Sequence, residues 1–252
     1  MSKHESATPT TDTSAAAATE FAPGLFVRGF TPPLRLADFR LAAFDMDSTL
    51  INIECIDEIA AVAGRGPQVA AITEAAMRGE ITDFKESLRR RLALLKGVPE
   101  AALHAVYAQR LQINPGVELF LQACRDAGLK TLLVSGGFTF FSDRVRERLF
   151  IDSARANVLE IAGGALTGGL IEQPWGDIVD GEQKRATLIE TCASLGFSPT
   201  QAIAVGDGAN DLPMMNAAGL SIAFHAKPKV RAQAMVSITE GGMERALAVF
   251  GA

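Results

Sequence analysis

Strand-like and helix-like segments alternate along the second half of the sequence, and no other pattern limits the possible folds as much. Short apolar runs at 129–137, 201–208 and 220–224 predict buried strands. The stretches between them have the apolar periodicity of amphipathic helices. Because parallel strands need long crossover connections, this alternation predicts a parallel sheet with helices on both faces. The predicted helices span 116–128, 138–150, 182–196 and 210–219, and 156–171 predicts a hairpin that turns at Gly163 and Gly164.

The segment from residue 54 to 110 interrupts this alternation. It follows a predicted buried strand, "LAAFDMD", and carries helical periodicity without strand signals in "ECIDEIAAVAG", "PQVAAITEAAM", "TDFKESLRRRLALLKG" and "PEAALHAVYAQ". We therefore expect an α/β protein with a Rossmann-like three-layer core around a parallel sheet, at residues 23–53 and 111–252. A small helical cap domain is inserted after the first strand, at 54–110. Residues 1–22, rich in Ser, Thr and Ala, are expected to form a disordered tail.

Composition excludes several classes of protein. The net charge of −5 argues against a nucleic-acid partner. No apolar run reaches the roughly 18 residues that a membrane helix needs, and the start of the sequence lacks the pattern of a signal peptide. The three cysteines, Cys55, Cys124 and Cys192, are widely spaced and form no CxxC pair, so neither a disulfide framework nor a zinc site is indicated. A cytoplasmic location is expected.

Polar residues follow three of the predicted strands, in "AFDMDST", "LLVSGG" and "AIAVGDGAND". Ligands of open parallel sheets bind at the carboxyl ends of the strands, so these three ends are expected to converge. Several carboxylates in one pocket require a hard cation, and oxygen ligands without His or Cys favour Mg²⁺. The residues expected at the site are Asp45, Asp47, Ser135, Asp207, Asn210 and Asp211.

The two carboxylates spaced two residues apart suggest a reaction at phosphorus. Asp45 could attack phosphorus and form an acyl phosphate, which divides a difficult hydrolysis into two steps. Asp47 could give a proton to the leaving oxygen and later take one from water. Ser135 could donate a hydrogen bond to a phosphoryl oxygen, and the backbone of "SGG" could approach closely because glycine has no side chain. Lys184 is our candidate for the balancing positive charge.

The ordered series "DMDST", "VSGG", a Lys ahead of a helix, and "GDGAND" resembles the haloacid dehalogenase-like phosphatases. A finer match, "DMDSTLINIECIDEIA" with "EAAMRGEITDFKESLRRRLALLKG", resembles the branch of that family that acts on phosphoserine. The resemblance extends from about Phe26 to the end of the sequence. It implies a Mg²⁺-dependent phosphomonoesterase that converts L-phosphoserine to L-serine and phosphate, the last step of serine biosynthesis, through an aspartyl phosphate.

The resemblance also implies roles for individual residues. It makes Asp45 the phosphorylated nucleophile and Asp47 the general acid and base. It assigns Mg²⁺ to Asp45, the backbone carbonyl of Asp47, and Asp207. Phosphate contacts are implied for Ser135, Gly136, Lys184 and Asn210, and substrate contacts from the cap for Glu54, Met77, Phe84 and Arg91.

Helical phase distinguishes the three arginines at 89–91. At roughly 100° per residue, Arg91 lies about 20° from Phe84, whereas Arg89 and Arg90 lie roughly 140° and 120° away on either side. Arg91 is therefore expected to reach inward. A guanidinium there suits the planar carboxylate of an amino acid, and Glu54 could bind its ammonium group.

Two alternatives remain open. The same chemistry could act on another small phosphomonoester, such as phosphohomoserine or phosphoglycolate. A non-enzymatic receiver module, which carries a phosphoryl group on an aspartate as a signal, also pairs carboxylates with Ser or Thr and Lys at strand ends. A receiver is a compact domain of about 120 residues, however, and would need neither a helical cap nor Asp47.

Overall fold

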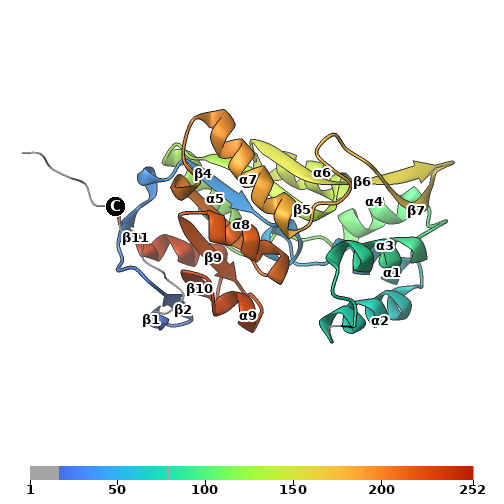
Figure 1. Ribbon diagram of the computed structural model, residues 1–252, viewed down its shortest axis with the longest axis horizontal. Coiled ribbons are helices and arrows are strands. Elements are labelled where there is room, and N and C mark those ends of the chain that lie inside the picture. The colour runs from blue at the N-terminus through green and yellow to red at the C-terminus, as the bar shows by residue number, and fades with distance from the viewer. Residues whose placement is uncertain (1–16, 79, 252) are drawn as a thin grey trace, which may run out of the picture.

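A large central sheet organises the part of the chain that the computed structural model describes, residues 17–78 and 80–251 (Figure 1). Its strands lie in the order β1 (Thr19–Ala22), β2 (Leu25–Val27), β10 (Val236–Ile238), β9 (Leu220–Phe224), β8 (Ala202–Gly206), β4 (Leu41–Phe44), β5 (Lys130–Phe138), β6 (Ser153–Ala162) and β7 (Ala165–Ile171). Two short strands, β3 (Leu34–Arg35) and β11 (Phe250–Gly251), pair separately.

The strands from β10 to β6 run parallel, as the alternating sequence predicts. At the two edges the pairing becomes antiparallel, between β2 and β10, between β1 and β2, and between β6 and β7. The β6–β7 turn lies between Ala162 and Ala165, so the predicted hairpin at Gly163 and Gly164 is confirmed. A Rossmann-like α/β core is therefore the observed fold.

Neighbouring residues of each central strand point to opposite faces of the sheet, so both faces are apolar. Helices cover both of them. On β4, Ala42 and Phe44 pack into the core shared with α5 (Val117–Asp126) and α6 (Thr139–Leu149). Leu41 and Ala43 pack into the core shared with α7 (Gly181–Leu195) and α8 (Leu212–Ala217). All four β4 residues are fully buried, which explains why this strand reads as a continuous apolar run. A short helix, α9 (Pro228–Arg231), connects β9 to β10.

The predicted helical segment forms α1 (Cys55–Val62), α2 (Gly66–Met77), α3 (Phe84–Leu94) and α4 (Glu100–Gln109). Figure 1 shows these helices together beyond one end of the core, next to the β6–β7 hairpin. Backbone hydrogen bonds join the hairpin to the α3–α4 connection: Gly97 N–H donates to Leu166 O at 2.7 Å, and Leu166 N–H donates to Val98 O at 2.9 Å. The hairpin therefore supports the cap, a contact that the sequence pattern does not indicate.

The predicted end of the tail at residue 22 is wrong, because Thr19–Ala22 form β1 and pair with β2. The strand "LAAF" is likewise not the first strand, since β1, β2 and β3 precede it. Strand β2 pairs with β10, about 210 residues further along the chain, so no local sequence pattern reveals it. Most of the predicted tail, residues 1–16, lies outside the described residues. None of the helices within residues 17–78 and 80–251 has both the length and the apolar character that crossing a membrane requires.

Candidate active site

Three neighbouring strands bring the predicted site residues together. Asp45 directly follows β4, and its backbone N–H donates to Val205 O on β8 at 3.0 Å. Ser135 lies on β5 at the other side of β4, and Asp207 directly follows β8. The expected convergence at the carboxyl ends of the strands is therefore observed.

A buried ammonium group links two of the carboxylates. Lys184, near the start of α7, is fully buried, and its Nζ donates to Asp45 Oδ1 and to Asp211 Oδ1, each at 2.6 Å. Burial works to lower the pKa of Lys184, but the charges of Asp211 and Asp45 outweigh it and hold that pKa above its usual value. Lys184 therefore stays positively charged. The helix that carries it is capped by Asp180, which accepts from Gln183 N–H at 2.8 Å.

Asp211 has a supporting role in the loop after β8. Its Oδ2 accepts from the backbone N–H groups of Asp207 at 3.1 Å and Gly208 at 2.9 Å, so both of its oxygens are engaged. A Cβ added at Gly206 would lie 2.5 Å from Asp211 Cγ, which explains the glycine there. The loop "GDGAND" thus folds around the Asp211 carboxylate.

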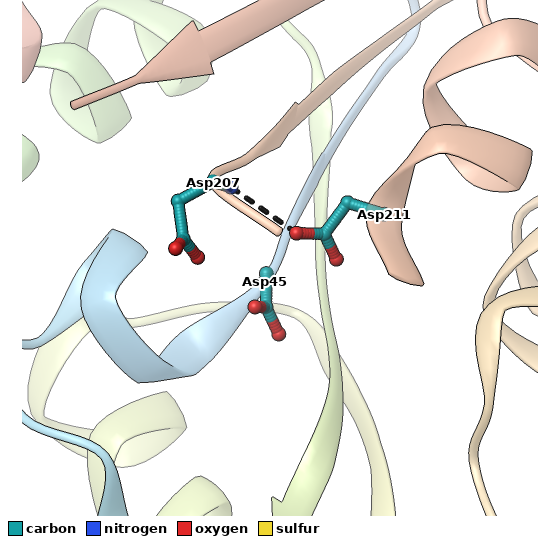
Figure 2. A group of neighbouring side chains, drawn as sticks. All are labelled: Asp45, Asp207 and Asp211. Carbon is teal, nitrogen blue, oxygen red and sulfur yellow. Dashed lines mark hydrogen bonds between the residues drawn. The ribbon is translucent and has the colours of Figure 1, made fainter. Parts of the chain in front are cut away.

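Figure 2 shows the carboxylates of Asp45, Asp207 and Asp211 side by side, with Asp45 from the end of β4 and the other two from the loop after β8. One oxygen of each lies within 4.8 Å of the others. Burial, followed by the charge of Asp211, raises the pKa of Asp207 to about 7, and the same two causes raise the pKa of Asp45. The single positive charge of Lys184 does not balance the negative charge of these three carboxylates.

The cluster fits a hard divalent cation. Because Asp211 is already bound at both oxygens, Asp45 and Asp207 are the side chains left to bind an ion. Thr49 Oγ1 is placed to donate to Asp207 Oδ1 at 3.4 Å, which leaves the second oxygen of Asp207 available. An all-oxygen donor set of this kind can hold a metal ion of the Mg²⁺ type.

Asp47 lies in a different environment. Its Oδ2 accepts from Cys55 N–H at the start of α1 at 3.0 Å. Its Oδ1 is buried and has no hydrogen-bond partner among the described residues. Burial, followed by the nearby charge of Glu54, raises the pKa of Asp47 to about 7. A carboxyl group with this pKa can both donate and accept a proton near neutral pH.

The turn after β4 depends on contacts that sequence reasoning missed. Ser48 adopts a φ of 58°, which is uncommon for a residue other than glycine, and its Oγ donates to Glu54 Oε1 at 2.8 Å. Asn114, beyond the cap, donates through Nδ2 to Thr49 O at 2.9 Å and Ile51 O at 3.0 Å. Asn114 is 65 residues from Thr49. No local pattern marks Asn114 as part of the site.

The "SGG" loop lies against both the catalytic turn and the cap. Gly137 N–H donates to Ser135 Oγ at 2.9 Å. A Cβ added at Gly136 would lie 3.1 Å from Phe84 Cζ, and one at Gly137 would lie 3.4 Å from Asp47 Oδ2. Larger residues would therefore crowd Phe84, so glycine allows the cap to approach the loop.

Arg91 is the inward-facing arginine of the three, so the prediction from helical phase is confirmed for its orientation. It is half-buried, and it lies near Asp57, Glu54 and Asp47, whose charges act on it. Burial lowers the pKa of Arg91, and these carboxylates offset part of the effect. Arg89 and Arg90 are exposed, and they pair with Asp177 and Glu86.

Two predicted residues are not joined to this arrangement by any described contact. The amide oxygen of Asn210 lies against Gly208, where an added Cβ would be 2.3 Å from it. Met77 is the last residue of α2, and its side chain lies outside what the structure describes.

Comparisons with known proteins agree with this geometry. Residues 39–219 match the haloacid dehalogenase-like hydrolase family. A phosphoserine phosphatase of Polaromonas sp. is 67% identical over 91% of this chain and 97% of its own length, and one of Albidiferax ferrireducens is 65% identical over 92% and 98%. Among solved structures, a substrate-bound phosphoserine phosphatase complex is 35% identical, with a TM-score of 0.77, over 84% of this chain and 99% of its own.

Proposed function

Because this chain belongs to the haloacid dehalogenase-like hydrolases, we propose that it hydrolyses phosphoserine to serine and phosphate through a phosphoryl group carried by Asp45. Its activity is that of a phosphoserine phosphatase, as in relatives that match over more than nine-tenths of its length. The observation that carries the mechanism is the pair of adjacent carboxyl groups: Asp45 accepts a hydrogen bond from the ammonium of Lys184 at 2.6 Å, whereas Asp47 accepts one from Cys55 N–H at 3.0 Å and has a pKa of about 7. Membership of a hydrolase family leaves the receiver alternative without support.

In the first step, an oxygen of Asp45 attacks phosphorus and the bond from phosphorus to the serine oxygen breaks. Asp47 gives its proton to that oxygen, so serine leaves as a neutral alcohol. In the second step, Asp47 takes a proton from water as the water oxygen attacks phosphorus. The acyl phosphate bond then breaks and regenerates the Asp45 carboxylate with release of phosphate.

The remaining core residues bind and orient the phosphoryl group. Ser135 donates to a phosphoryl oxygen, since its Oγ already accepts from Gly137 N–H and its own proton is free. Lys184 supplies a fixed positive charge next to Asp45. Gly136 and Asn210 are proposed to add contacts from the two loops.

We propose Mg²⁺ as the metal, held by Asp45, Asp207 and the backbone carbonyl of Asp47. A bound Mg²⁺ would neutralise the excess negative charge of the site and polarise the phosphoryl group. The fit rests on Asp45 and Asp207, each of which has a carboxylate oxygen in the acidic cluster, where the oxygens lie within 4.8 Å of one another.

The cap recognises the amino-acid part of the substrate in this proposal. Arg91 binds the serine carboxylate, and Glu54 binds its ammonium group. The two side chains are near each other and carry opposite charges, as a zwitterion requires. Phe84 closes the pocket over Gly136, and Met77 is proposed to line it. A cytoplasmic location accords with three free thiols at Cys55, Cys124 and Cys192.

A turnover assay tests the proposal. Phosphate release should be catalytic with phosphoserine and Mg²⁺, should stop after chelation, and should be faster with phosphoserine than with phosphohomoserine or phosphoglycolate. A higher kcat/KM for either of these two esters would transfer the assignment to that substrate. Full activity after exhaustive chelation would refute the metal requirement.

A further inference from the structure

Asn157 on β6 is a buried polar residue that the mechanism above does not use. Its side chain is fully buried. Its Nδ2 donates to Gly136 O at 2.8 Å, and its Oδ1 accepts from Val179 N–H at 2.8 Å. The amide therefore joins the "SGG" loop to the segment that leads into α7.

The position of Asn157 coincides with an irregularity in the sheet. Strands β5 and β6 pair in register up to Val134 and Arg155, and the next pair is Phe138 with Asn157. Residues 135–137 on β5 thus face the single residue 156 on β6, so the ordinary ladder of backbone hydrogen bonds is interrupted there. The Asn157 side chain donates a hydrogen bond to the Gly136 carbonyl, a backbone group that the interrupted ladder would otherwise leave unpaired.

This contact determines how the Ser135 hydroxyl is presented. The peptide group between Gly136 and Gly137 is planar, so a fixed Gly136 carbonyl also fixes the Gly137 N–H. That N–H donates to Ser135 Oγ at 2.9 Å. With its oxygen occupied in this way, the Ser135 hydroxyl is left to donate its own proton.

The other end of the amide acts on the opposite wall of the site. Val179 immediately precedes Asp180, the capping residue of α7, and α7 carries Lys184. A Cβ added at Gly136 would lie 3.2 Å from Val179 O, so the two segments are in close contact. Asn157 therefore fixes the distance between the loop that carries Ser135 and the helix that carries Lys184.

We propose that Asn157 is a positioning residue for the phosphoryl group, and this inference rests on the function proposed above. It acts through the Gly136 carbonyl and Val179 N–H and does not touch the substrate itself. Its loss should weaken binding of the phosphoryl group, which is common to all substrates, and leave recognition of the amino-acid part unchanged.

The experiment compares Asn157→Ala and Asn157→Leu with a matched control on the neighbouring strand β5. Both Asn157 variants remove the two hydrogen bonds, and leucine keeps the branched shape of the side chain. Thr131 is also fully buried, and its Oγ1 donates to Asp152 Oδ2 at 2.8 Å at the opposite end of β5. Thr131→Val removes this hydrogen bond and the one that Thr131 Oγ1 accepts from Asp152 N–H at 3.0 Å, both far from the "SGG" loop. For each protein, the measurements are thermal stability, the inhibition constant of inorganic phosphate, and kcat/KM for phosphoserine and an aryl phosphate.

We expect the Asn157 variants to raise the inhibition constant of phosphate about tenfold or more, and to lower kcat/KM for the two esters by the same factor. Thr131→Val should lose stability while the inhibition constant stays within twofold of wild type. Asn157 variants that lose stability but bind phosphate as wild type does would overturn the proposal. The proposal would also be overturned if neither Asn157 variant folded at a low temperature at which Thr131→Val folds, because Asn157 would then be purely structural.

The design separates this inference from the proposed function. Phosphate inhibition can be measured with the aryl phosphate as the reporter substrate. A wild-type enzyme that hydrolyses the aryl phosphate but not phosphoserine would refute the substrate assignment, and the comparison between Asn157 and Thr131 variants would still be decisive for the positioning role.

Discussion

Asp45 and Asp47 are two residues apart, yet their surroundings assign them different chemistry. Burial and the charge of Asp211 raise the pKa of Asp45, and the buried ammonium group of Lys184, which donates to Asp45 Oδ1, opposes them. Asp47 accepts from Cys55 N–H and lies near Glu54, and its pKa of about 7 lets it hold a proton. The sequence motifs identify both residues, but only the three-dimensional contacts show why the two carboxyl groups differ.

Asp47→Asn should slow phosphoserine hydrolysis by about two or more orders of magnitude, because an amide cannot protonate the leaving alcohol. An aryl phosphate with a good leaving group needs less protonation and should lose less activity in the first step. Measurement of the burst of aryl alcohol against steady-state turnover checks this. Equal losses in the burst rate and in phosphoserine turnover would count against the acid role.

Arg91→Ala should lower kcat/KM for phosphoserine by roughly 2 kcal/mol or more in transition-state terms, because a charged partner of the substrate carboxylate is removed. Hydrolysis of an aryl phosphate without amino-acid groups should change little. Arg90→Ala is the matched control, since Arg90 is exposed and pairs with Glu86 on the same helix. If Arg91→Ala slowed both substrates equally, the assignment of Arg91 to the carboxylate would be wrong.

At the level of elements, helix α3 is joined to the core by ion pairs. Lys85 Nζ lies 2.9 Å from Asp177 Oδ1 and 3.6 Å from Asp180 Oδ2, and Arg89 also pairs with Asp177. The segment that carries Asp177 is held to the core by Trp175, whose ring centroid lies 5.6 Å from the guanidinium of Arg155. These contacts hold the cap against the core, and Arg89 takes part in them although it is exposed.

Asp177→Asn should weaken the attachment of the cap to the core. Exposed pairs of this kind contribute roughly 0.2–1 kcal/mol each, so we expect a rise in KM of about two- to tenfold for phosphoserine and aryl phosphate alike. High salt should reduce the difference from wild type because the groups are exposed. Glu182→Gln removes an exposed charge that pairs only locally with Arg185 and serves as the control. A salt-independent effect, or none, would contradict the role of these pairs.

Sequence patterns predict the elements more fully than the contacts between them. The periodicity of 54–110 predicts the helical cap, and the apolar runs predict β4, β5, β8 and β9. The β6–β7 contact with the cap, the pairing of β2 with β10, and the Asn157 amide depend on residues distant in sequence. Such contacts follow from packing of the whole chain, and no local pattern encodes them.

For the molecule as a whole, the site brings several carboxylates close together in a chain that is already acidic, with a net charge of −5. Asp47 and Asp207 each have a pKa of about 7 in the folded protein, against 3.8 as the ordinary value. The folded state therefore binds protons more tightly than the unfolded state. This contribution to stability is fully present below about pH 4 and is lost as the pH rises to about 7.

In metal-free protein, Asp207→Asn should remove the part of this pH-dependent loss of stability that comes from Asp207. Relative to wild type, the free energy of unfolding of the variant should rise between pH 4 and 7, by an amount on the order of a few kcal/mol. Added Mg²⁺ should raise the Tm of wild type at pH 7 and that of the variant much less, because the ion binds the folded site. Parallel pH profiles for the two proteins would contradict this account of the charge cluster.

In the proposed mechanism, Asp45 carries the phosphoryl group during hydrolysis. Acid quench during turnover of phosphoserine, followed by mass spectrometry of peptides, identifies the residue that carries it. We predict a phosphoryl group on Asp45 in wild type, and no phosphoryl group with a loss of several orders of magnitude in turnover for a folded Asp45→Asn protein. A phosphoryl group on another residue, or near-normal turnover by Asp45→Asn, would contradict the mechanism.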